Sequence, residues 1–159
     1  MNTYTYKAGQ FLPIDIYKAW DFFSSAKNLA VITPPELDFK ILTLMDDKQI
    51  YEGMLIDYTV KPLFGIPAHW QTEISKMKKP LFFTDRQLKG PYKIWEHTHA
   101  FYEKDNGIFM QDEVKYQLPF GIIGRITHSL IVRKKLENIF TYRKEILKKI
   151  FEHNGNNHH

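Results

Sequence analysis

Apolar positions near the C-terminus repeat with helical spacing over the longest stretch of the chain. From Leu118 to about Phe151, apolar side chains occupy one stripe of a 3.6-residue wheel and polar side chains the opposite side. The stripe consists of Ile122, Ile126, Val132, Leu136, Phe140, Leu147 and Ile150. This pattern predicts a single amphipathic helix of about nine turns. Because no helix of similar length is predicted elsewhere, the apolar stripe needs another broad surface to pack on.

The segments before this helix alternate between apolar and polar residues, as strands do. Two short helices are predicted after the first strand, starting near Pro13 and Asp15 and ending at Thr33-Pro34-Pro35. The predicted strands are Thr3–Phe11, Asp38–Met45, Gln49–Pro62, His69–Met77, Leu81–Leu88, Tyr92–Glu103 and Ile108–Gln117. The sequence therefore predicts one α+β domain over residues 1–153, an antiparallel sheet packed on the long C-terminal helix, and a disordered tail at 154–159.

The last hairpin allows a prediction of which side chains face the helix. With Asn106-Gly107 as a two-residue turn, Phe101 lies opposite Asp112, His99 opposite Val114 and His97 opposite Tyr116. One face then carries Trp95, His97, His99 and Phe101 together with Met110, Asp112, Val114 and Tyr116. A polar cluster is therefore expected on an otherwise apolar inner face.

We expect these residues to contribute to a ligand pocket. Asp85 and Gln87 share a face with Phe83 and are expected at the rim, where ligand contact and a hydrogen-bond network explain them equally well. Trp70 is expected either in the core or in the pocket wall. The predicted ligand-binding residues are Trp70, Asp85, Gln87, Trp95, His97, His99, Phe101, Asp112 and Tyr116.

The two histidines and the helix arginines each have two interpretations. The histidines belong either to a satisfied core network or to a ligand clamp or acid–base group. His-x-His spacing also occurs in zinc sites, but the sequence places no cysteine, third histidine or second carboxylate beside the pair, so we predict no metal and no cofactor. Arg133 and Arg143 fall within the apolar stripe, and either extend outward to solvent or pair with an inward carboxylate such as Asp112.

Composition narrows the class of protein. The net charge is +4, but the basic residues are mixed with acidic ones, so we expect a solvated helix face and no nucleic-acid partner. Cysteine is absent, which excludes disulfides and thiolate chemistry. Aromatic residues make up 15% of the chain, which favours a sheet-rich protein with internal space. No apolar run has membrane-spanning length, and the N-terminal residues do not form a secretion signal. We therefore expect a cytoplasmic protein without membrane insertion.

Several motifs resemble a known superfamily. They are Gly90-Pro91-Tyr92 through Trp95-Glu96-His97-Thr98-His99-x-Phe101, Met110-x-Asp112-Glu113-Val114-x-Tyr116-x-Leu118-Pro119-Phe120-Gly121, Thr33-Pro34-Pro35 and Ile139-Phe140-x-Tyr142-Arg143. Together with the order of elements, they resemble a bacterial branch of the START and birch-pollen-allergen superfamily, also called SRPBCC. The resemblance implies a helix-grip fold, in which a strongly curved antiparallel sheet wraps a long C-terminal helix around a cavity.

Three functions follow from these expectations. The first is binding of a small hydrophobic or aromatic molecule between the sheet and the final helix. The second, which the resemblance also implies, is a polyketide cyclase, aromatase or dehydratase-like enzyme that uses the pocket histidines. The third is a regulatory partner-binding module, acting for instance on an oxidoreductase or as a homodimer, and it predicts a stable complex with the partner.

Overall fold

A computed structural model describes residues 2–45, 49–119, 121, 123, 126 and 128–152. Seven antiparallel strands form one sheet in the order β1-β7-β6-β5-β4-β3-β2. The strands are β1 (Tyr4–Leu12), β2 (Lys40–Ile41), β3 (Leu55–Leu63), β4 (Ile66–Lys78), β5 (Phe82–Lys89), β6 (Ile94–Lys104) and β7 (Gly107–Gln117). The helices are α1 (Ile16–Phe23), α2 (Ala26–Val31), a 3₁₀ turn at Pro35–Leu37, a π-helical turn at His128–Val132, and α4 (Arg133–Glu152).

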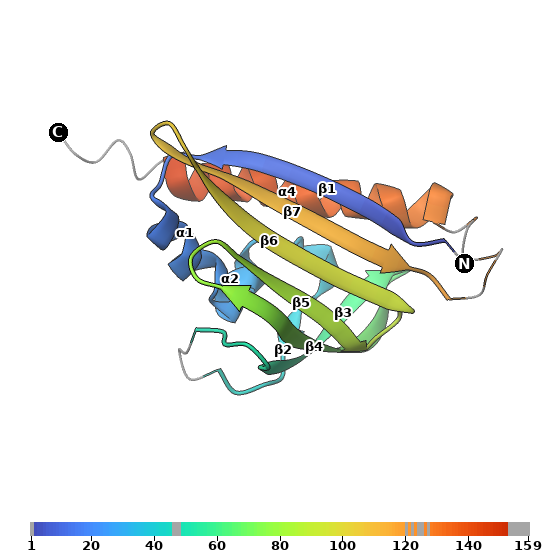
Figure 1. Ribbon diagram of the computed structural model, residues 1–159. Helices are drawn as coiled ribbons and strands as arrows, with labels where there is room; N and C mark the ends of the chain where they lie inside the picture. Colours follow the sequence, from blue (N-terminus) through green and yellow to red (C-terminus); the bar gives the residue numbers. More distant parts are fainter. Residues whose placement is uncertain are drawn as a thin grey trace.

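The sheet curves, and α4 lies along β1 and β7 while α1 and α2 lie near one end (Figure 1). This arrangement confirms the helix-grip α+β fold and the two short helices after the first strand. Asp15 caps α1, because its carboxylate oxygen accepts hydrogen bonds from the backbone N–H groups of Tyr17 and Lys18, both at 3.0 Å. No helix in the described part of the chain is long and apolar enough to cross a membrane.

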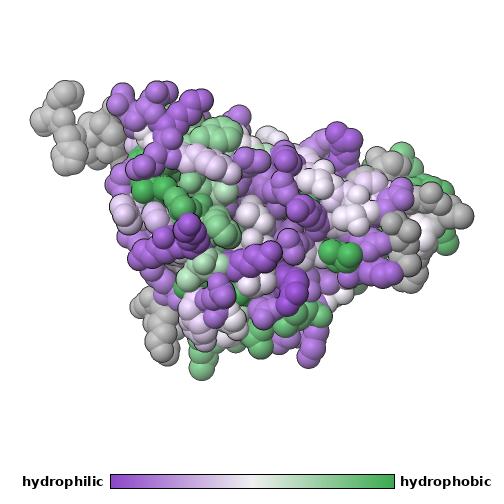
Figure 2. All heavy atoms as spheres, viewed as in Figure 1, coloured by the Kyte–Doolittle hydropathy of each residue, from purple (hydrophilic) through white to green (hydrophobic). Residues whose placement is uncertain are grey.

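Side-chain alternation sets the two faces of the sheet. On β6 and β7 the buried positions are every second residue, including His97, His99 and Phe101 on β6 and Asp112 and Val114 on β7. The visible face in Figure 2 is mostly hydrophilic, with a hydrophobic area at the left and smaller ones along the lower edge and at the right. The inner face therefore carries both the core and the candidate site.

The predicted register of the last hairpin is wrong by two residues. His97 pairs with Val114, His99 with Asp112 and Phe101 with Met110, and the turn is Asp105-Asn106, in which Asp105 has a φ of 51°. Because side chains alternate with a period of two, this shift keeps every one of them on the predicted face.

The final helix also differs from the prediction. Leu118 and Pro119 are not helical. Gly121, Ile123 and Ile126 are α-helical, but a π-helical turn at His128–Val132 separates them from α4, which begins at Arg133. A π-helical turn inserts one residue and so rotates the following stripe by about 100° relative to what precedes it. The predicted inner residue Ile126 is accordingly 57% exposed, whereas Leu136 is buried; Ile122 lies outside the described residues.

The strands around the first hairpin are shorter than predicted, although β2 and β3 do pair. The N–H groups of Leu42 and Thr43 both bond to the carbonyl of Asp57, at 2.8 and 3.3 Å, so the regular ladder ends after Ile41. On the other side Gly53, at a φ of 87°, turns the chain just before β3. The predicted Asp46-Asp47-Lys48 turn lies outside the described residues, as does the predicted disordered tail.

Candidate functional site

A cavity of about 170 Å³ lies among the inner face of the sheet, α4, α2 and the segment that follows α2. Its walls are mostly apolar and aromatic. They include Phe39, Tyr58, Trp70, Tyr92, Trp95, Leu37, Ile56, Val60, Leu136 and Ile139. Trp70 and Trp95 meet edge to face with their ring centroids 5.2 Å apart, which gives the cavity a rigid aromatic wall.

Five of the nine predicted ligand-binding residues line this cavity: Trp70, Asp85, Trp95, His97 and His99. The other four do not.

Each of these four side chains is bonded to, or packed against, other residues of the protein. Gln87 bonds the backbone of Tyr92, donating to its carbonyl at 2.7 Å and accepting from its N–H at 3.2 Å. Phe101 and Tyr116 are fully buried in the packed core. Asp112 lies behind the two histidines, where it contacts both of them.

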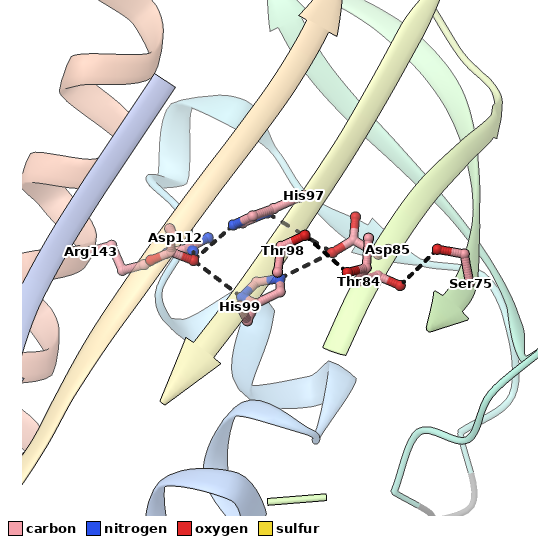
Figure 3. Close-up of polar contacts among 8 residues, drawn as sticks. All are labelled: Ser75, Thr84, Asp85, His97, Thr98, His99, Asp112 and Arg143. Atoms are coloured by element: carbon pink, nitrogen blue, oxygen red, sulfur yellow. Dashed lines mark hydrogen bonds and ion pairs between the residues drawn. The ribbon is translucent and has the colours of Figure 1, made fainter. Parts of the chain in front are cut away.

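The polar part of the cavity is a cluster contributed by three neighbouring strands and α4 (Figure 3). Strand pairing places Asp85 opposite His97 and His99 opposite Asp112. His97 Nε2 lies 2.7 Å from Asp112 Oδ1, and His99 Nε2 lies 3.0 Å from Asp85 Oδ2. His99 Nδ1 is 3.2 Å from Asp112 Oδ1, without the alignment of a hydrogen bond. Arg143 extends from α4 and donates from Nη1 to Asp112 at 3.3 Å.

This geometry settles the alternatives for the two arginines. Arg143 is 5% exposed and pairs with the inward Asp112, as one of the two interpretations expected. Arg133 lies on the outside and contacts Glu137, one turn away on the same helix. Phe140 also lies under the Arg143 guanidinium, at 4.9 Å from ring centroid to carbon, so the cation is held from two sides.

The cluster shifts the pKa values of its members in different directions. Burial alone raises the pKa of Asp112, but the charge of Arg143 and the contacts with His97 and His99 outweigh it and hold that pKa well below its usual range. Burial, assisted by the neighbouring His99, lowers the pKa of His97. Burial also opposes the charge on His99, yet the carboxylates of Asp112 and Asp85 prevail and raise its pKa. The two carboxylates of the cluster, Asp85 and Asp112, therefore have two positive partners. These are Arg143 and His99, whose raised pKa favours its charged form.

Sequence reasoning missed several residues of the site. Tyr58 and Tyr92 were not predicted in it, although alternation around Asp57 gave a signal for Tyr58; burial raises the pKa of both tyrosines, so both hydroxyls stay protonated. The contributions of α2 and of Ile139 had no signal, because which helix residues border a cavity depends on how the helix docks on the sheet.

No protein-family model matches the chain, and no curated protein matches it in sequence. Solved structures match it throughout its length. The START superfamily protein from Mycobacterium smegmatis has a TM-score of 0.69 at 11% identity, with 94% of this chain and 97% of that chain covered. The ginseng major latex-like protein 151 from Panax ginseng has a TM-score of 0.63 at 9% identity, with 94% and 97% covered.

A third match is to part of a larger protein. The nucleoside-diphosphate sugar epimerase from Corynebacterium glutamicum has a TM-score of 0.63 at 22% identity, with 91% of this chain but only 28% of that chain covered. At these identities the matches establish the fold alone. The chain has the helix-grip fold shared by START-type and birch-pollen-allergen-like proteins, as the sequence motifs indicated.

Proposed function

We propose that this protein binds a small aromatic molecule that carries a hydrogen-bond-accepting oxygen. The observation behind the proposal is an aromatic cavity that is lined by two residues with buried, unpartnered N–H groups. Trp70 Nε1 and Arg143 Nε are both buried, and neither has a hydrogen-bond partner among the described residues. A buried donor without a partner costs about 1–3 kcal/mol, so a ligand oxygen that accepts from it gains binding free energy.

The size of the cavity limits the ligand. An apolar cavity of about 150 Å³ admits benzene, whereas pockets for drug-sized molecules span roughly 300–1,000 Å³. At about 170 Å³, this cavity suits a molecule of one or two rings. The rings would lie against Trp70 and Trp95, and the oxygen would point toward Arg143.

Calorimetric titration with phenols, naphthols and aromatic carboxylates, each paired with its oxygen-free parent hydrocarbon, tests this proposal. We expect the oxygenated compounds to bind more tightly than the hydrocarbons. Ile139→Trp should weaken binding at least about tenfold, or 1.4 kcal/mol, because the half-buried Ile139 lines the cavity from α4 and a larger side chain would fill it.

Asn138→Trp is the matched control, since Asn138 is the exposed neighbour of Ile139 on the same helix. It should bind as the unaltered protein does. Equal affinities of the Ile139→Trp and Asn138→Trp proteins would place the ligand elsewhere, and tighter binding of the hydrocarbons would remove the role of the buried donors.

A second candidate function is catalysis on the bound molecule, as in cyclases and dehydratases. The observation that favours it is that two imidazoles, each within 3.0 Å of a carboxylate oxygen, line the same cavity as the aromatic wall. A carbonyl compound bound there would have a proton donor or acceptor within reach. Mass spectrometry after incubation with aromatic and polyketide-like carbonyl compounds should then show a product that His97→Gln no longer forms. Binding of these compounds with no product would contradict it.

A further inference from the structure

Three potential metal ligands converge on one wall of the cavity. Asp85 Oδ2 lies 3.0 Å from His99 Nε2 and 3.9 Å from His97 Nδ1, and one donor atom from each of the three residues lies within 4.8 Å of the others. Metal–ligand bonds of about 2.0–2.2 Å place the donor atoms of a tetrahedral site roughly 3.3–3.6 Å apart. We infer that Asp85, His97 and His99 form a binding site for one divalent transition-metal ion.

The hydrogen bonding of His97 leaves a lone pair directed toward this site. When its proton is on Nε2, His97 donates to Asp112 over 2.7 Å, and Nδ1 carries a free lone pair on the side of Asp85. At 3.9 Å, Nδ1 and the Asp85 oxygen are too far apart for a hydrogen bond. Two electron-rich atoms therefore face each other at a separation that a bridging cation suits.

The surroundings supply the support that metal-bound histidines usually have. Metal-ligating imidazoles commonly donate their second N–H to a carboxylate, which fixes the tautomer and the ring orientation. Asp112 holds this position on His97, and its charge is balanced by Arg143. Phe83 stacks on the His99 ring, with centroids 4.3 Å apart and an interplanar angle of 19°. Both rings are thus restrained before any ion binds.

The donor set indicates which ions the site would accept. Two imidazole nitrogens and one carboxylate favour zinc, cobalt, nickel or ferrous iron over magnesium and calcium, which prefer oxygen. Three protein ligands leave at least one coordination position open. All three residues line the cavity, so this position faces the space where an aromatic ligand would lie. The metal site is nevertheless independent of the proposed function and holds whether or not an organic molecule binds.

Titration of the full chain, freed of metal with a chelator and dialysed, tests the site with Co²⁺ and Zn²⁺ alone. We expect one Co²⁺ per chain, with visible absorption bands of low-symmetry cobalt that Zn²⁺ abolishes. Asp85→Asn and His97→Gln should each weaken Zn²⁺ binding by more than about tenfold. Tenfold is the lower end of the loss in metal affinity that follows when a residue that only supports a metal ligand is replaced. Circular dichroism verifies that each variant is folded.

Two control variants address other histidines. His69→Gln removes an exposed imidazole that also contacts a carboxylate, Asp57 at 2.8 Å, and should leave Zn²⁺ binding unchanged. The double variant His158→Ala/His159→Ala removes the paired histidines at the end of the chain and should also have no effect. The inference is overturned by absent Co²⁺ and Zn²⁺ binding, by full affinity in the folded Asp85→Asn protein, or by loss of binding in the His158/His159 variant.

Discussion

Replacing Asp112 with asparagine should destabilise the protein by about 3–5 kcal/mol, the usual cost of removing one partner from a buried ion pair. Asp112 is 2% exposed and is the carboxylate to which Arg143 donates. Without it, the Arg143 guanidinium stays buried with its charge uncompensated, and His97 and His99 lose their shared acceptor. Chemical denaturation monitored by tryptophan fluorescence measures this loss.

The double variant Asp112→Leu/Arg143→Met distinguishes the ion pair from the position itself. Removing both charges eliminates the uncompensated ion, and apolar replacement of a buried pair is often neutral or stabilising. We therefore expect the double variant to be more stable than Asp112→Asn. A double variant as unstable as the single one would show that the histidine contacts, and not Arg143, make Asp112 necessary.

A more exposed ion pair, between β1 and β7, provides the matched control. Lys7 contacts Glu113, the neighbour of Asp112, at 3.0 Å, and the Lys7 side chain is 60% exposed. Lys7→Ala should change the free energy of unfolding by less than about 1 kcal/mol, because solvent screens exposed pairs. A comparable loss in both variants would contradict the role given to burial.

The inner face of the last hairpin could be predicted because it depends only on alternation. His97, His99 and Asp112 face inward in the structure even though the predicted register is wrong by two residues. Which of the inward-facing residues border the cavity, and which lie in the packed core, could not be predicted. Phe101 and Tyr116 share the face with the histidines, yet both are packed in the core: Phe101 meets Trp20 of α1 edge on, and Tyr116 lies against Tyr4 of the neighbouring strand β1.

The position of Asp85 beside the histidines also required the structure. The pairing of β5 with β6 brings Asp85 opposite His97, and this pairing crosses the irregular connection at Gly90 and Pro91, whose geometry the sequence pattern does not fix. The sequence prediction therefore found no second carboxylate next to the two histidines. Because Asp85 was not placed beside the histidines, no metal site was predicted from the sequence. The inferred site depends on Asp85 as its third ligand.

Trp20→Ala should cost about 3–5 kcal/mol, the range for truncating a large buried aromatic side chain. Trp20 is 1% exposed on α1 and meets the rings of Phe83 and Phe101 edge on, with centroids 5.7 and 6.3 Å away. Tyr17→Ala, on the same helix but 61% exposed, should cost less than about 1 kcal/mol. Denaturation of the two variants side by side measures the difference, and similar losses would mean that α1 is not anchored through Trp20.

The same substitution should reach the candidate site through Phe83. Phe83 contacts Trp20 edge on and also stacks on His99, so loss of the indole removes a neighbour of the ring that restrains His99. We expect Trp20→Ala, under conditions where it remains folded, to broaden the imidazole signals of His99 in NMR spectra while those of the exposed His69 stay unchanged. Unchanged His99 signals would show that the strand pairing of β5, β6 and β7 positions the cluster without help from α1.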